Sequence, residues 1–140
     1  MKANKIRWAV AAILLMGAAQ LHAQAMFPDI TVNLTFPQFQ RLKTDGGFVY
    51  LDGGLKGIIL YRSGEGAFNA YDRACPYHPS ANCATVQVDG STLYMVDRCC
   101  NSSFSFPDGQ PTGGPAVRPL IQYRIEISGN TLKISDEIIN

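Results

Sequence analysis

The sequence contains little histidine and little charge. Among 140 residues there are 2 histidines, and charged residues make up 16% of the chain, with 12 Lys and Arg against 11 Asp and Glu. A formal net charge of +1 provides no strong positive field, so we do not expect nucleic-acid binding. The 13 Gly and 8 Pro indicate many turns without low complexity. The composition therefore excludes a coiled coil and a disordered tail, and it favours a small globular protein.

The one long apolar run of the sequence lies at its N-terminus. Residues 1–7 carry three basic side chains and precede an apolar run from Trp8 to about Ala19. Ala23-Gln24-Ala25 then offers the small residues of a cleavage site. This pattern predicts a secretory signal peptide over residues 1–25, since the run is shorter than the roughly 20 residues of a membrane span. We therefore expect export to the periplasm or cell envelope, with no stable membrane span after cleavage.

The remaining residues, 26–140, predict one domain built from strands. Apolar and polar residues alternate in several short runs, which are rich in β-branched and aromatic side chains and are separated by Gly, Asp and Asn turns. The expected strands cover residues 30–36, 48–51, 57–62, 67–71, 85–88, 93–96, 121–127 and 131–134. Residues 39–42 have no clear type, and the Gly/Pro-rich segment 107–115 is expected to be a loop. The pattern predicts an all-β sandwich or barrel of about eight or nine short strands.

All four cysteines lie in this predicted domain. Cys75 and Cys83 follow the expected strand 67–71, and Cys99 and Cys100 follow the expected hairpin 85–96. In an exported domain of this size, four cysteines first suggest two disulfides, because the compartment is oxidising. The spacing alone leaves three pairings open.

The second half of the chain carries a series of short motifs. They are Ala67-Phe68-Asn69-Ala70-Tyr71-Asp72-Arg73-Ala74-Cys75-Pro76-Tyr77-His78-Pro79, Asn101-Ser102-Ser103-Phe104, Asp108-Gly109, Gly114-Pro115-Ala116, Pro119-Leu120 and a closing hairpin over 123–134. In this order the motifs resemble those of the Rieske family. The resemblance implies a small Rieske-like β-sandwich or barrel with two Cys-bearing loops at one end. In that family the loops hold a [2Fe–2S] cluster by two Cys and two His.

The cluster ligands of the family are only partly present here. Alignment on Phe104 places Cys75 and Tyr77 at the first Cys and His, and Asp97 and Cys100 at the second Cys and His. After removal of residues 1–25, His78 is the one histidine left, and it cannot supply two ligands. The resemblance therefore implies a Rieske-like domain with a degenerate cluster site, in which the ring of Tyr77 is expected to fill the vacated space.

The resemblance also implies a pairing of the cysteines. Some Rieske proteins carry a disulfide between positions that match Cys83 and Cys99. Cys75 and Cys100 would then face each other across the degenerate site and form a second bridge. In this interpretation the protein holds no cofactor, and two disulfides connect its loops. It would be a binding or accessory module rather than an enzyme, with an unknown protein partner at the tip of the Cys loops.

Two metal interpretations stay open beside this one. A noncanonical [2Fe–2S] cluster held by Cys75, His78, Cys99 and Cys100 would make the protein an electron carrier. Zinc could use the same four residues, since three Cys and one His form a common zinc shell. Asp97 is most simply interpreted as a turn residue or as the ion-pair partner of Arg98. No acid–base pair or Ser/His/Asp set is recognisable, so we expect no catalytic residues.

Overall fold

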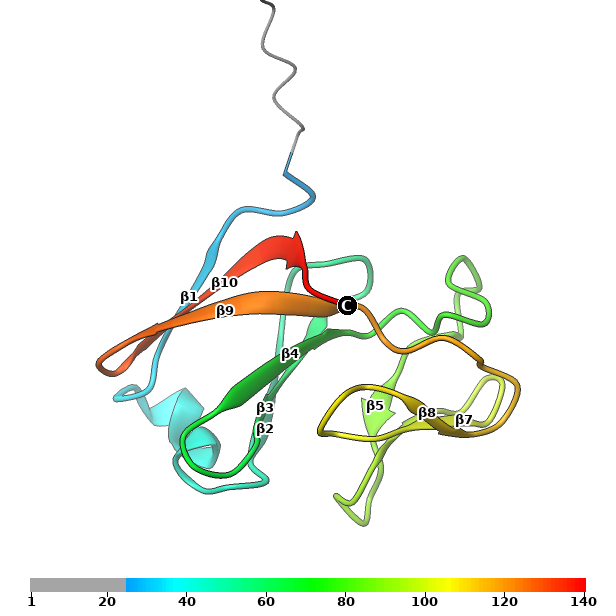
Figure 1. Cartoon of the computed structure of the whole chain (residues 1–140), viewed down its shortest axis with the longest axis horizontal. Helices are drawn as coiled ribbons and strands as arrows, with labels where there is room; N and C mark the ends of the chain where they lie inside the picture. The colour runs from blue at the N-terminus through cyan, green and yellow to red at the C-terminus, as the bar shows by residue number, and fades with distance from the viewer. Residues whose placement is uncertain (1–24) are drawn as a thin grey trace, which may run out of the picture.

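The computed structural model of the 140-residue chain describes residues 25–140 (Figure 1). The predicted signal peptide, apart from its last residue, lies outside these described residues. The strands are β1 (Ile30–Asn33), β2 (Phe48–Leu51), β3 (Ile58–Arg62), β4 (Phe68–Asp72), β5 (Gln87–Val88), β6 (Met95–Asp97), β7 (Ser102–Phe104), β8 (Pro111–Gly113), β9 (Gln122–Ser128) and β10 (Thr131–Ile138). One 3₁₀-helix, η1 (Pro37–Lys43), follows β1. Within residues 25–140 no helix is long and apolar enough to cross a membrane.

The strands form two antiparallel sheets. The larger sheet has six strands in the order β1-β10-β9-β4-β3-β2, and the smaller sheet has four in the order β5-β6-β7-β8. Figure 1 shows the smaller sheet beside the end of the larger one, where the chain leaves β4 and later returns to β9. The whole segment between β4 and β9 therefore forms the smaller sheet and its loops, and the larger sheet is the base that carries them.

Strand β3 is buried on both faces. Its residues Ile58 and Leu60 pack into one apolar cluster, and Ile59 between them packs into a second. Successive side chains of a strand point to opposite faces, so a strand between two cores needs an uninterrupted apolar run. The first cluster, the base core, also contains Val32, Leu42, Ala70, Tyr123, Leu132 and Ile134. The second, the junction core, contains Tyr71, Cys75, Val86, Met95, Phe104, Phe106 and Leu120 among its members.

The two sheets are joined by aromatic side chains of the junction core. The buried Tyr71 hydroxyl on β4 donates a hydrogen bond to Phe106 O over 2.7 Å. The ring of Phe106 stacks on Tyr61 of β3 at a centroid distance of 4.1 Å. Because the Tyr71 hydroxyl has an acceptor, its large ring is buried without leaving a polar group unsatisfied. The smaller sheet is thus held against a fixed face of the base.

The prediction of an all-β fold is confirmed, and the expected hairpin is present as β5 paired with β6. Two details of the prediction were wrong. The described residues contain ten strands instead of about eight or nine, because β7 forms where no strand was predicted and the edge strand β8 lies in the segment that was expected to be a loop. Strand β1 ends at Asn33 instead of continuing to 36, because the Asn33 side chain accepts hydrogen bonds from the amide and hydroxyl of Thr35 and starts a turn. Residues 39–42 belong to η1, which buries Leu42.

Candidate functional site

Two loops that carry all four cysteines start from strands of the two sheets. The first Cys loop, residues 73–86, connects β4 to β5, and the second Cys loop, residues 98–101, connects β6 to β7. Main-chain contacts close the base of the first loop, where Val86 N donates to Arg73 O over 2.7 Å. The second loop is short, because Asp97 and Ser102 at its two ends are register partners in the smaller sheet. The side chains at the bases of both loops are therefore held by paired backbone.

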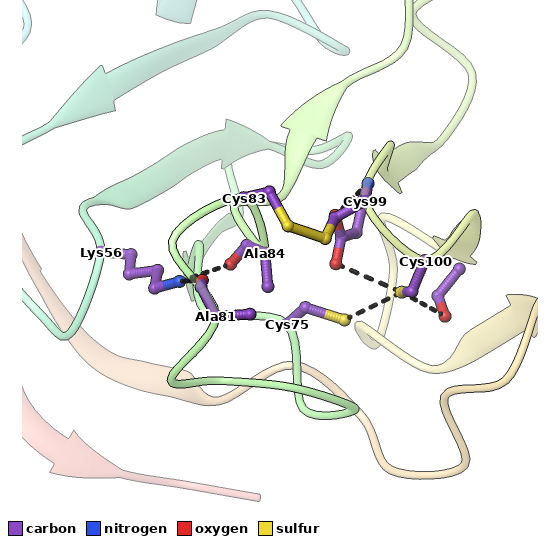
Figure 2. Close-up of a disulfide and its surroundings, with 9 residues drawn as sticks. Lys56, Cys75, Ala81, Cys83, Ala84, Cys99 and Cys100 are labelled. Carbon is purple, nitrogen blue, oxygen red and sulfur yellow. Dashed lines mark hydrogen bonds between the residues drawn. A yellow bond between two sulfur atoms is a disulfide. The ribbon is translucent and has the colours of Figure 1, made fainter.

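A disulfide joins the two loops. Cys83 of the first loop and Cys99 of the second are bonded, with their Cα atoms 5.5 Å apart (Figure 2). Both residues are exposed, so the bridge lies on the surface of the loops. The bridge connects segments separated by 16 residues in the sequence and ties β5 and β6 together beyond their short pairing.

Lys56 holds the first Cys loop from the side of the base. Its Nζ donates hydrogen bonds to Ala81 O and, over 3.0 Å, to Ala84 O (Figure 2). Lys56 lies in the turn between β2 and β3, so one ammonium group connects the larger sheet to two carbonyls of the loop. A charged donor shared by two carbonyls fixes the loop more firmly than a neutral hydrogen bond would.

Beneath the disulfide, two thiols and a carboxylate meet. Cys75 Sγ lies 3.6 Å from Cys100 Sγ, and Cys100 Sγ lies 3.2 Å from Asp97 Oδ2. One ligand atom from each of the three residues lies within 4.8 Å of the others. Cys75 and Asp97 are buried and Cys100 is half-buried. Figure 2 shows the thiols of Cys75 and Cys100 facing each other. This Cys75–Asp97–Cys100 group is the chemically distinctive feature of the loops.

The group is supported from its far side by Ser102 and the segment after β8. Ser102 Oγ lies 3.1 Å from Cys100 Sγ and accepts a hydrogen bond from Ala116 N, also over 3.1 Å. Gly114 makes this close approach feasible, because a Cβ there would come within 2.5 Å of Asn101 O, and its φ of +80° suits glycine. The Gly114-Pro115-Ala116 segment therefore packs directly on the second Cys loop.

Burial, followed by the hydrogen bond to the Asp97 carboxylate, raises the pKa of the Cys75 thiol to about 12. The reactive form of cysteine is the thiolate, so a thiol with this pKa is a poor nucleophile at neutral pH. The group therefore favours the thiol form of Cys75 over the thiolate. Its chemistry is that of a protected thiol pair.

The structure brings together two of the four residues expected to bind a cofactor. Cys75 and Cys100 belong to the group, whereas Cys99 is in the disulfide and His78 lies outside the group. The His78 side chain is exposed and contacts the ring of Tyr77 edge-on, with centroids 4.1 Å apart. Tyr77 is itself 45% exposed, so the expectation that its ring fills the position of a cluster histidine was wrong. The two rings pair with each other at the loop surface instead.

Asp97 is the site residue whose interpretation changes most. It is not the ion-pair partner of Arg98, which contacts Asp89 over 3.2 Å. Asp97 is fully buried at the end of β6. Its Oδ1 accepts a hydrogen bond from Cys99 N, two residues later, over 2.8 Å, so the interpretation as a turn residue is confirmed. The signal was present in the sequence, because Asp97 follows the buried Met95 by two residues and a strand places both side chains on one face.

The donor set does not fit the [2Fe–2S] centre typical of the Rieske fold. Such a centre needs two Cys on one iron and two His on the other. The described residues contain one histidine, which is exposed, and a carboxylate takes the place of one cysteine. The three donors that do meet form a single group rather than two pairs.

Solved structures similar to this one identify its fold. The Rieske protein PetC3 of the plasma membrane of the cyanobacterium Synechocystis matches with a TM-score of 0.58 and 20% identity, over 76% of this chain and 98% of that protein. A chain in the complex of reduced oxygenase and oxidised ferredoxin of carbazole 1,9a-dioxygenase matches with a TM-score of 0.55 and 17% identity, over 84% of this chain and 99% of that one. No protein-family model and no curated protein matches the sequence. The fold is therefore Rieske-like, and the predicted resemblance to the Rieske family is confirmed at the level of the fold.

Proposed function

We propose that this chain, which has a Rieske-like fold, is an exported binding or accessory module that works without an iron–sulfur cluster and is not an enzyme. One observation carries the proposal. Of the four aligned positions of the cluster ligands, only Cys75 keeps the residue type of the family, because Tyr77, Asp97 and Cys100 stand at the positions of a His, a Cys and a His. The Cys83–Cys99 bridge keeps the loops together with no metal required, and the domain keeps a rigid tip for recognition.

A second bridge between Cys75 and Cys100 completes this arrangement in an oxidising compartment. The sulfur atoms are 3.6 Å apart, and bonding brings them to about 2.05 Å. The two thiols lose two protons and two electrons, which pass to a disulfide oxidant of the compartment, and one S–S bond forms. The approach needs little movement, because both residues are held at the bases of their loops. The added cross-link is expected to stabilise the domain by about 2–4 kcal/mol.

The tip of the first Cys loop is the proposed contact with a protein partner. Tyr77 and His78 present adjacent rings to solvent there. Next to them is a mainly apolar hollow of about 420 Å³, whose lining includes Leu55, Pro76, Pro79, Arg118 and Ile121. Exposed aromatic rings beside an apolar hollow with one guanidinium are common features of protein-binding surfaces. Export itself is proposed from the predicted signal peptide over residues 1–25.

Native mass spectrometry of the exported protein, purified without reductant or added metal, tests this proposal. We expect a chain that begins at Met26, with the polypeptide mass less four hydrogens and no cofactor. The matched control is the Cys75→Ala/Cys100→Ala variant, which should lack only the second bridge. Its mass should therefore be that of its own reduced polypeptide less two hydrogens. A mass increased by two irons and two sulfides would overturn the cluster-free module and indicate an electron carrier. A chain that keeps residues 1–25 would overturn cleavage of the predicted signal peptide.

A further inference from the structure

We infer that in the dithiol form Cys75, Asp97 and Cys100 bind one zinc-class divalent cation. This single-ion site goes beyond the proposed binding module and differs from a two-iron cluster in its ligands. The three donor atoms converge from two loops and lie within 4.8 Å of one another. Two thiolates and one carboxylate select a borderline-soft ion such as Zn²⁺ over the hard ions Mg²⁺ and Ca²⁺.

The spacing of the donors matches one tetrahedral ion. Ligands at normal Zn–S and Zn–O lengths lie about 3.5–3.8 Å apart around tetrahedral zinc. The Cys75–Cys100 sulfur distance of 3.6 Å lies within this range, and the distance of 3.2 Å from Cys100 Sγ to Asp97 Oδ2 is slightly shorter. Only small side-chain movements are therefore needed to admit the ion. Three protein ligands leave a fourth position for water or for a group from a partner.

The surroundings of Asp97 point independently to a cation. Its carboxylate is fully buried, and Oδ1 accepts one backbone hydrogen bond from Cys99. Its other contacts are with the thiols of Cys100, whose Sγ lies 3.2 Å from Oδ2, and of Cys75, and thiols are weak donors. A buried carboxylate normally needs strong donors or a cation, because its desolvation is otherwise uncompensated. A metal ion at the thiols supplies that compensation.

The hydrogen bonds that would orient the ligands of such a site are already in place. Ser102 Oγ, 3.1 Å from Cys100 Sγ, receives the amide of Ala116, so its own hydroxyl hydrogen is free to donate to the Cys100 thiolate. The amide of Cys99 orients the Asp97 carboxylate in the same way. Outer-shell hydrogen bonds of this kind fix the direction of ligands and raise metal affinity.

Metal titration of the reduced protein tests the site. The Cys83→Ala/Cys99→Ala background leaves Cys75 and Cys100 as the sole cysteines, and the wild-type chain is titrated in parallel in case this variant folds poorly. Under anaerobic conditions with reductant, Zn²⁺ alone is added against a chromophoric chelator, and Co²⁺ alone serves as the spectroscopic probe. We expect one ion per chain, with a thiolate-to-cobalt charge-transfer band and the d–d bands of tetrahedral Co²⁺.

Ligand variants then identify the donors. Asp97→Asn should lower the Zn²⁺ affinity by at least about 10-fold, whereas Asp89→Asn, a control carboxylate on the neighbouring turn, should leave it unchanged. Cys75→Ala/Cys100→Ala in the wild-type chain should abolish the charge-transfer band. A band that survives this change, or no charge-transfer band in a folded wild-type chain, would overturn the site. These titrations do not measure the iron, sulfide and disulfide content of the exported protein. The mass spectrometry therefore tests the proposed function separately from the ion site.

Discussion

The base and the Cys loops of this molecule each bury one carboxylate, and they treat it differently. In the base, Asp72 accepts three hydrogen bonds, from Leu55 N at 2.6 Å, Tyr123 Oη at 2.7 Å and Ala74 N at 2.7 Å. In the loops, Asp97 accepts one backbone hydrogen bond and otherwise faces the thiols of Cys75 and Cys100. Both side chains are fully buried. The first carboxylate is held by three strong neutral donors of the fold, whereas the second has one amide and two thiols, which are weak donors.

This difference follows from the elements that surround each residue. Asp72 ends β4 where the turn before β3 and the ring of Tyr123 on β9 converge, so donors reach it from three sides. Asp97 lies where two loops meet, and cysteines rather than amides occupy its other side. We therefore expect the loops to depend more than the base on cross-links and on Lys56. Variants that remove these supports should separate the two regions.

The largest effect is expected from Asp72→Ala. The substitution leaves the part-buried amide of Leu55, the buried amide of Ala74 and the buried Tyr123 hydroxyl without this acceptor, and we expect the free energy of unfolding to fall by about 3–5 kcal/mol. Urea denaturation followed by fluorescence measures the loss. Asp97→Ala is the matched variant and should cost only about 1–2 kcal/mol, because it orphans one amide. Equal losses for the two variants would contradict the contrast between the carboxylates.

The next effect concerns the bridge between the loops. Cys83→Ala/Cys99→Ala should lower the free energy of unfolding by about 3 kcal/mol, because the closed segment spans 16 residues and its restriction of the unfolded chain is lost. Hydrogen exchange should quicken in the Cys loops and the smaller sheet while β9 and β10 keep their protection. If the amides of β9 and β10 exchange faster as well, the stability of the base is not independent of the loops.

The smallest of the three effects is expected for Lys56→Met. The substitution removes the two hydrogen bonds to Ala81 O and Ala84 O but keeps the apolar stem, and it should cost about 1–2 kcal/mol. Amide exchange of residues 81–84 should rise most. Lys133→Met is the control, because Lys133 is an exposed residue paired with Asp29 and should change stability little. If amide exchange in the first Cys loop is unchanged in the Lys56 variant, the disulfide alone holds this loop.

Part of the fold could be predicted because local patterns of residue type and spacing indicate it. The run Ile58-Ile59-Leu60 and the alternation from Gln122 to Ile127 mark strands by residue type and period. Strand β8 could not be predicted in this way, because Pro111 and Gly113 have low strand propensity and pair only since β7 lies alongside them. The buried position of Asp97 was likewise missed, because Asp is usually exposed and the register of β6 decides its side.

The sequence by itself determined the all-β class and the shortage of histidine, because periodicity and residue counts are properties of the sequence alone. The family resemblance implied that Cys75 and Cys100, 25 positions apart in the sequence, face each other, but only the tertiary structure decided that Asp97 joins them. Those contacts arise when β6 and β7 pair and both loops fold against the junction core. Such long-range proximity depends on how strands assemble, and no local pattern in the sequence encodes it.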